Sequence, residues 1–210
     1  QDLAYTATDI TVNHDFGGEI IYQLDASGRI TSAADPAGNS YQYSYNDDGM
    51  LRSVIYPGDS GNTLYHYEDA TFPDLLTGIT DATGNRFATW RYDSSRRAIS
   101  SEHAGGADLT RFDYTFTDDA IYPQTTVTNA LGKQTTYHYV RVNGVRKVFH
   151  VSGHASEDCV ASNQRYTFDN NAFIASYADW NGNLTTFSRD DRGREIERNE
   201  AAGSALERQI

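Results

Sequence analysis

The fold is decided by residues 35–51, which read DPAGNSYQYSYNDDGML. This stretch holds a turn, a run in which three tyrosines alternate with polar residues, and a second turn. Alternation at every second residue places the tyrosines on one face of a β-strand. Glycine supplies the left-handed backbone of a tight turn, and Asp or Asn stabilises its first residues, so a strand between two hairpin turns is predicted. The tyrosines are Tyr41, Tyr43 and Tyr45, and the turn glycines are Gly38 and Gly49.

Both turn phrases recur along the chain. The phrase at Gly38, a glycine followed by Asn or Lys, returns at Gly84, Gly132 and Gly182, which gives periods of 46, 48 and 50 residues. Repetition at such periods is the signature of arrays, propellers and solenoids. The phrase at Gly49 returns at Gly28 and Gly193, and in altered form at residues 92–99. We therefore assign structural turn roles to Gly28, Gly38, Gly49, Gly84, Gly132, Gly182 and Gly193.

A second aromatic strand is predicted between successive glycine phrases, so that each period holds about four strands of ~12 residues with their turns, a spacing typical of all-β proteins. No segment has a helical period. The slip from Phe87 to Trp90 predicts a β-bulge, and residues 142–163 predict an enlarged loop or a longer hairpin. The second-strand aromatics are Tyr65, Tyr67, Phe112, Tyr114, Phe116, Tyr166 and Phe168.

These patterns predict an all-β fold of repeated antiparallel β-hairpins, stacked edge to edge into a curved single-layer ribbon. A hairpin of alternating aromatic and polar residues cannot bury its apolar face alone, so neighbouring repeats must stack. We expect residues 1–16 to be a lead-in strand of a preceding repeat, residues 17–197 to be the hairpin array, and residues 198–210 to begin the next repeat or to fray. Because Gln1 is not an initiator methionine, we interpret the sequence as an excerpt.

Composition and charge limit the classes of function that the chain can have. Aromatic residues make up 12% of the chain, which suits a sheet with one solvent-exposed face. The net charge is −12, and many of the acids stand in turns. Nucleic-acid binding requires clustered Lys and Arg, and the sequence has no such stripe, so we expect no nucleic-acid partner.

Other features of the sequence set further bounds. One cysteine, Cys159, cannot form an internal disulfide and leaves the redox compartment open. No apolar run approaches the ~18 residues of a membrane span, and no signal peptide opens the chain.

The linked phrases resemble the YD repeats of bacterial Rhs proteins over residues 17–197. The turn phrase Tyr-(Asn/Asp)-x-x-Gly-Arg-(Leu/Ile) is seen at residues 45–51, 24–30 and 189–196, with the Asp-x-x-Gly-Asn phrase about ten residues before it. The sequence departs from the family pattern where Arg96 replaces the glycine, where Arg189 replaces the tyrosine, and at residues 140–145.

The resemblance implies a ribbon of β-hairpins that spirals into a hollow shell around a C-terminal toxin, as in polymorphic toxins such as type VI secretion effectors and in toxin-complex components. It implies a non-enzymatic wall segment, and no counterpart of the self-cleaving core segment or of a toxin domain is found here. The implied partners are the rest of the shell and an enclosed toxin domain. The implied location is secreted, at the cell surface, or delivered by a bacterial secretion system.

Enzymatic and metal sites are weakly indicated. His150 and His154, with Glu157, Asp158 and Cys159 behind them, have ligand-like residue types, but Gly153 and small residues favour a solvated loop. Adjacent acids are expected in turns for backbone reasons, so we do not assign them to glycoside hydrolysis or to a calcium site. We expect no catalytic residue, no metal and no cofactor. The acidic pairs are Asp47–Asp48, Asp118–Asp119 and Asp190–Asp191.

The aromatic rows leave an alternative open. Exposed rows could stack on sugar rings in a cell-surface adhesion or carbohydrate-binding module, whereas cross-strand packing would contribute roughly 0.2–1 kcal/mol per pair to the wall. Open sheet edges also predict self-association. The candidate row residues are Tyr41, Tyr43, Tyr45, Tyr65, Tyr67, Phe112, Tyr114 and Phe116.

Overall fold

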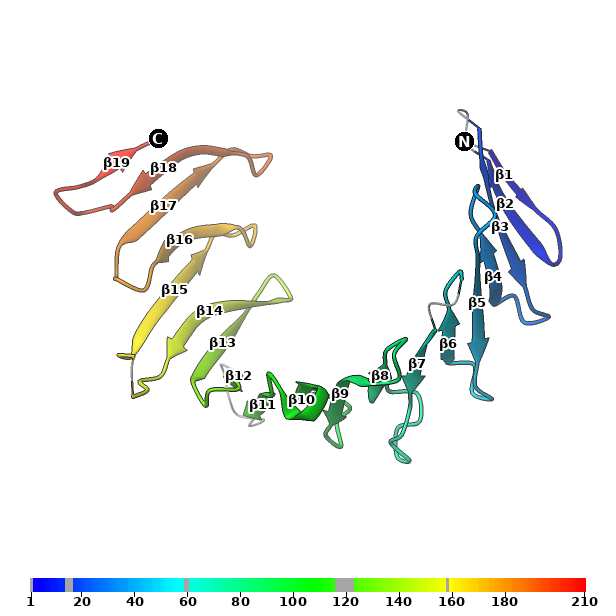
Figure 1. Cartoon of the computed structure of the whole chain (residues 1–210). Helices are drawn as coiled ribbons and strands as arrows, with labels where there is room; N and C mark the ends of the chain where they lie inside the picture. Colours follow the sequence, from blue (N-terminus) through cyan, green and yellow to red (C-terminus); the bar gives the residue numbers. More distant parts are fainter. Residues whose placement is uncertain (1, 14–16, 59–60, 116–122, 158) are drawn as a thin grey trace. The chain divides into compact units, whose positions relative to one another are not determined.

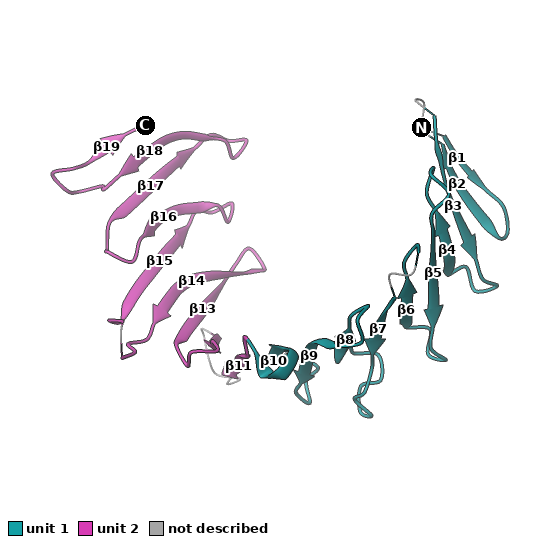
Figure 2. Ribbon diagram, in the orientation of Figure 1, with its two compact units in different colours: residues 1–107 teal, residues 108–210 magenta. Residues whose placement is uncertain are grey.

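The fold is all-β, as the sequence predicts. The computed structural model describes residues 2–13, 17–58, 61–115, 123–157 and 159–210, and it divides into two compact units, residues 1–107 and 108–210 (Figure 2). Within each unit the antiparallel strands pair in chain order, and Figure 1 follows them by label and colour.

The first unit contains ten strands and one short 3-10 helix among its described residues. They are β1 (Asp2–Tyr5), β2 (Asp9–Asn13), β3 (Glu19–Leu24), β4 (Ile30–Ala34), β5 (Ser40–Tyr45), β6 (Leu51–Ile55), β7 (Asn62–His66), β8 (Gly78–Thr80), β9 (Arg86–Tyr92), β10 (Ala98–His103) and the helix η1 (Ala104–Gly106).

The second unit contains nine strands within the part of the chain that the structure describes. They are β11 (Thr110–Thr115), β12 (Gln124–Thr128), β13 (Gln134–Val142), β14 (Val145–Gly153), β15 (Ser162–Phe168), β16 (Ile174–Ala178), β17 (Leu184–Arg189), β18 (Glu195–Glu200) and β19 (Arg208–Gln209).

One five-residue turn recurs between successive strands. The backbone N–H of its first residue donates to the carbonyl of the fifth, and the N–H of the fourth donates back to the first. The fourth residue always has a positive φ. This is a type I turn followed by a left-handed residue, which matches the twist of the flanking strands. Nine copies lie in the described ranges, at residues 25–29, 35–39, 46–50, 81–85, 93–97, 129–133, 169–173, 179–183 and 190–194.

The first side chain of the turn explains the acidic composition. The Asp25 carboxylate accepts the backbone N–H groups of Ser27 and Arg29 at 2.8 and 2.9 Å, and the Arg29 side chain at 2.8 Å. These bonds, with that from the Arg29 N–H the largest, hold the pKa of Asp25 below its ordinary value. The pKa of Asp190 is lowered in the same way by the Arg194 N–H. Turn acids of this kind are occupied by their own backbone.

The two turn phrases are therefore the same turn in structural terms, and all seven predicted turn glycines occupy its left-handed position. Arg96 takes that position with φ 64°, although the family pattern has glycine there. The turn at residues 169–173 was not predicted, because Ala172 stands in place of the glycine, with φ 65°. The hydrogen bonds of Asp169 to Asn171 and Phe173 are nevertheless the same as in the other copies.

The structure confirms two predicted irregularities, a β-bulge near Phe87 and a longer hairpin within residues 142–163. Thr80 pairs with Arg86 and Ile79 with Ala88, so Phe87 is the extra residue of a bulge. The interval 142–163 contains the turn of the longer hairpin β13–β14, made by Asn143 and Gly144 with φ 48° and 80°. Positive φ at both central residues is the hairpin geometry that Asn-Gly favours.

The sheet has little core. The buried apolar side chains among the described residues are small, namely Ala33, Val54, Ala88 and Val151. The accessible surface is 13876 Å², whereas a compact monomer of 23.4 kDa exposes roughly 9,700 Å². Domains normally bury a sheet face under a second layer. Within each unit the described strands form a single layer, whose contacts run between neighbouring strands.

Candidate functional site: the two faces and turn edge of the sheet

One face of the first unit carries the predicted tyrosine rows. Tyr22 and Tyr41 flank Ala33 across strands β3–β5, and Tyr43 pairs with Val54. Large rings therefore cover small residues, which are the buried ones. The Tyr43 ring itself is half-buried, and burial, followed by the neighbouring tyrosines, raises the pKa of its hydroxyl.

The other predicted row residues are placed similarly. Tyr41 makes an edge-to-face contact with Tyr56, with ring centroids 6.1 Å apart. Tyr65 lies in β7 and Tyr67 just after it, both half-buried with hydroxyl pKa values raised mainly by burial. Phe112 and Tyr114 are half-buried in β11, and Phe116 lies outside the described residues. Each of these rings is therefore partly covered and partly exposed.

The tyrosine that begins the turn phrase joins one hairpin to the previous one through a hydrogen bond, which we call the clasp. The Tyr45 hydroxyl donates to the Ile30 carbonyl at 2.7 Å, and the Tyr92 hydroxyl donates to the Leu76 carbonyl at 2.6 Å. Arg189, which replaces the tyrosine, directs Nη2 to the Ile174 carbonyl at 3.4 Å. The departure from the family pattern therefore keeps the same acceptor position in the preceding strand.

We expect Tyr45→Phe to destabilise the first unit by about 1 kcal/mol, because it removes a hydrogen bond to a part-buried carbonyl. Tyr41→Phe is the matched control, since its ring contact with Tyr56 remains and only the hydroxyl is lost. Urea unfolding of the two variants measures the difference. Equal midpoints for both variants would show that the clasp contributes nothing.

Cations stack along the turn edge. The Arg29 guanidinium lies 4.7 Å from the Tyr45 ring centroid, with Nη1 close to Gly49. Arg189 lies 5.5 Å from the Phe173 centroid. The fifth residue of one turn thus covers the next turn on the same edge, and this contact couples neighbouring repeats.

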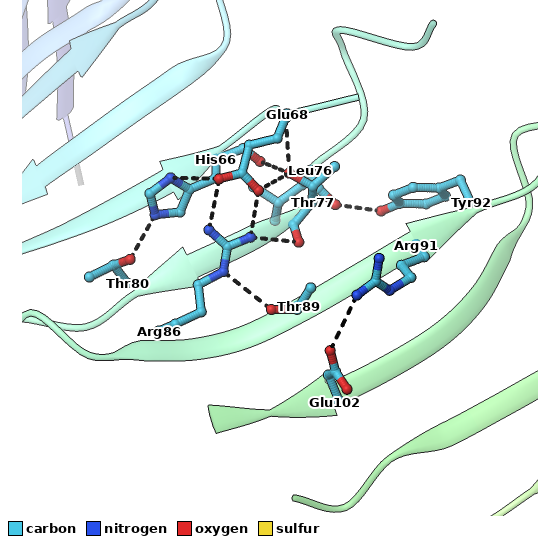
Figure 3. A network of polar contacts seen from close by, with 10 residues as sticks. All are labelled: His66, Glu68, Leu76, Thr77, Thr80, Arg86, Thr89, Arg91, Tyr92 and Glu102. Carbon is cyan, nitrogen blue, oxygen red and sulfur yellow. Dashed lines mark hydrogen bonds and ion pairs between the residues drawn. The ribbon is translucent and has the colours of Figure 1, made fainter. Parts of the chain in front are cut away.

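The opposite face is polar, and Figure 3 shows its network in the first unit. Arg86 makes a bidentate pair with Glu68 at 3.1 and 2.8 Å, and Arg86 Nη2 also donates to the Thr77 carbonyl. The pair, led by the Arg86 hydrogen bond, lowers the pKa of Glu68. Gly78 lies beneath it, and a β-carbon there would overlap the Arg86 guanidinium, so Arg86 would have to shift. The network joins β7, β8 and β9, and Glu68, Thr77 and Thr89 also line a cavity of about 370 Å³.

Two histidines of the second unit stack on its polar face. His138 in β13 and His150 in β14 pair directly across the strands, with ring centroids 4.8 Å apart and planes 16° from parallel. Their Nε2 atoms lie 3.2 and 3.4 Å from the Ser152 hydroxyl. His154 Nε2 bonds Thr136. The expectation that His150 lies in a loop is wrong, since β-pairing extends through Gly153.

No group of three metal-ligating side chains forms within the described ranges. Glu157 and Cys159 are exposed, and Asp158 lies outside the described residues. Asp47 and Asp48 are exposed in a turn, while Asp118 and Asp119 lie outside the described residues. Among the helices described, none has the length and apolarity to cross a membrane.

Protonation of the histidines should couple to folding. Burial, then His150, Arg165 and His154, lower the pKa of His138. Because an unfolded histidine titrates near 6.5, the unfolded chain binds more protons as the pH falls below about 7.5. The free energy of unfolding should therefore decrease as the pH falls from about 7.5 toward 5, at pH values above those at which the turn carboxylates titrate.

Urea unfolding at pH 8, 7, 6 and 5 measures this slope. His138→Gln should flatten the decrease, because it removes the buried imidazole whose pKa is lowered. His103→Gln is the control, because His103 lies in β10 of the first unit, away from the stacked pair. A slope unchanged by His138→Gln would contradict the assignment.

A groove of about 700 Å³ lies on the aromatic face of the second unit. Sequence reasoning missed it. The available signals were Trp180 inside a turn phrase and Arg189 in the tyrosine position. The groove is lined by Tyr137, Lys147, Val148, Val151, Gln164, Tyr166, Phe168, Ala172, Phe173, Ile174, Trp180 and Arg189.

Comparisons with known proteins agree with this architecture. The model of the RHS Repeat family matches residues 25–60. The crystal structure of TcdB2-TccC3-Cdc42 is similar at TM-score 0.59 and 14% identity, over 97% of this chain and 12% of that chain. The TcdB2-TccC3-TEV structure gives 0.56 and 14%, over 96% and 12%, and TcdB2-TccC3 gives 0.50 and 13%, over 99% and 14%.

The chain thus spans about an eighth of the length of the structures that it resembles. At these identities the likeness shows the fold. The comparison with curated proteins gave no significant match. The matched repeat at residues 25–60 and the shared hairpin fold together confirm the predicted resemblance to Rhs/YD-repeat proteins.

Proposed function

We propose that this chain is a non-enzymatic wall segment of a Rhs-type shell that encloses or delivers a toxin. The observation that carries the proposal is the single-layer sheet, in which each unit pairs its strands in chain order and exposes two chemically different faces. A wall needs to separate two compartments rather than to converge catalytic groups on one point. The accessible surface, well above that of a compact monomer, supports contacts beyond this chain.

We assign the wall to residues 17–197, with residues 1–16 and 198–210 continuing into neighbouring hairpins. Backbone pairing at open edges would join them to the rest of the shell, and edges left open would pair with a second copy. The rings at Tyr41, Tyr43 and Tyr45 serve cross-strand packing in this proposal. Their half-burial and the Tyr41–Tyr56 contact support packing over glycan stacking. We place the shell outside the producing cell, by secretion or by delivery.

The test uses the intact natural gene product. We expect a polypeptide segment outside residues 17–197 to resist limited proteolysis, and to become more readily cleaved when Gly61→Ala and Gly193→Ala disrupt the wall. Gly58→Ala is the control, because it shares the positive φ but a β-carbon there meets nothing within 4 Å. Mass spectrometry of the fragments reports the protected segment. Equal cleavage rates with and without the wall variants would overturn the proposal.

A further inference from the structure

The groove on the aromatic face of the second unit has the features of a binding site. It crosses five strands, from Tyr137 in β13 to Arg189 in β17. At about 4.8 Å per strand, four intervals span roughly 19 Å, which an extended peptide of about six residues covers. Because it follows an open sheet face, the groove suits a chain lying along it.

A register shift creates the apolar floor. His138 pairs with His150 but Tyr139 pairs with Val148, so Phe149 is an extra residue in β14. The bulge brings Val148 to the same face as Val151, although they are three positions apart in the sequence. Val151 is 6% exposed and forms the buried base of the groove.

Exposed apolar groups flank this floor. Trp180 from the turn at residues 179–183 is 45% exposed, Phe173 from the turn at residues 169–173 is 42% exposed, and Ile174 is 37% exposed. Aromatic side chains left open beside a concave apolar surface are typical of anchor sites for apolar side chains.

The charged residues that line the groove favour a ligand with carboxylate groups. The chain has a net charge of −12, yet the described lining of the groove contains Lys147 and Arg189 and no carboxylate. The Arg189 side chain is 20% exposed, its Nη2 donates to the Ile174 carbonyl at 3.4 Å, and its Nη1 lies 4.0 Å from Glu195. Both contacts are long, so a carboxylate in the groove would be a stronger acceptor for these Nη groups.

We infer that this groove binds an extended polypeptide segment that combines apolar side chains with carboxylates, with a carboxylate placed at Arg189. The apolar side chains occupy the floor at Val151 and the ring of Trp180, and the carboxylate accepts hydrogen bonds from the Nη groups of Arg189. The inference rests on the proposed function only for the source of the segment, which would be the enclosed cargo.

The test titrates the full chain with acetyl-Leu-Phe-Glu-Phe-Leu-Glu-amide and with the same peptide carrying Lys in place of Glu, by calorimetry at low salt. We expect saturable binding of the acidic peptide, at least about tenfold tighter than that of the basic one, and weakened by added salt. Arg189→Gln should cost the acidic peptide about tenfold, and Trp180→Ala should weaken it as well.

Arg192→Gln is the matched control, because this arginine is exposed in the turn at residues 190–194. If Arg189→Gln does not fold, Lys147→Gln tests the same charge selection. Equal affinity for both peptides, an equal loss in Arg192→Gln, or no saturable binding at millimolar peptide would overturn the inference. Because the readout is binding to this chain alone, such a failure would leave the shell proposal standing.

Discussion

Gly61→Ala should destabilise the first unit by about 3–5 kcal/mol, which combines a left-handed backbone penalty with a backbone overlap. Gly61 has φ 77°, and a β-carbon there would collide with the carbonyl group of Ala82 in the turn at residues 81–85. A carbonyl in a hydrogen-bonded turn cannot move aside as a flexible side chain can. The strand β7 that Gly61 leads into would have to separate from this turn.

Gly58→Ala separates the two contributions to the Gly61→Ala effect. It lies in the same connection with φ 72°, and a β-carbon there meets nothing within 4 Å, so we expect a loss of only about 1–2 kcal/mol. Urea unfolding followed by circular dichroism measures both variants. Equal losses would show that the Ala82 contact has no energetic weight.

Gly193→Ala should cost about 2–3 kcal/mol, because it combines φ 79° with overlap on a packed ring. The added β-carbon would lie 2.7 and 2.8 Å from two atoms of the Phe173 ring. Phe173 is the fifth residue of the turn at residues 169–173, so the ring must leave the contact that joins the two hairpins. The substitution therefore weakens coupling between repeats as well as the turn itself.

Hydrogen exchange should detect that loss of coupling. We expect amides of β17 and β18 to exchange faster relative to those of β13 and β14, because the hairpins would open more independently. Gly182→Ala is the control, since Gly182 occupies the same turn position with φ 84° and nothing within 4 Å. Uniform acceleration across both hairpins in Gly193→Ala would contradict the coupling role.

The turn chemistry was predictable because it is local. An Asp or Asn followed three residues later by glycine makes its hydrogen bonds within five residues, as at Asp25 and Asp35. The same locality explains why the turn at residues 169–173 was not predicted. Ala172 has no left-handed preference, so its turn is recognised only from the Asp169 hydrogen bonds and the positive φ that the paired strands impose.

The stacked histidines and the clasp residue depend on longer-range pairing. His138 and His150 are twelve residues apart, and only the hairpin register brings their rings together. Arg189 looked like a departure from the repeat, but its position opposite the Ile174 carbonyl shows that a different donor keeps the contact. Residue type alone does not report an acceptor fifteen residues away.

The sequence by itself determined an all-β repeat of hairpins, its periods and the turn role of its glycines, because alternation and turn hydrogen bonds act between near neighbours. Only the tertiary structure decided which residues share a face once a strand is bulged. The extra residue Phe149 reverses the alternation of β14, brings Val148 and Val151 together, and so builds the groove that ends at Trp180 and Arg189. A one-residue shift in pairing moves every following side chain to the opposite face, and it is set by strand partners rather than by the strand's own sequence.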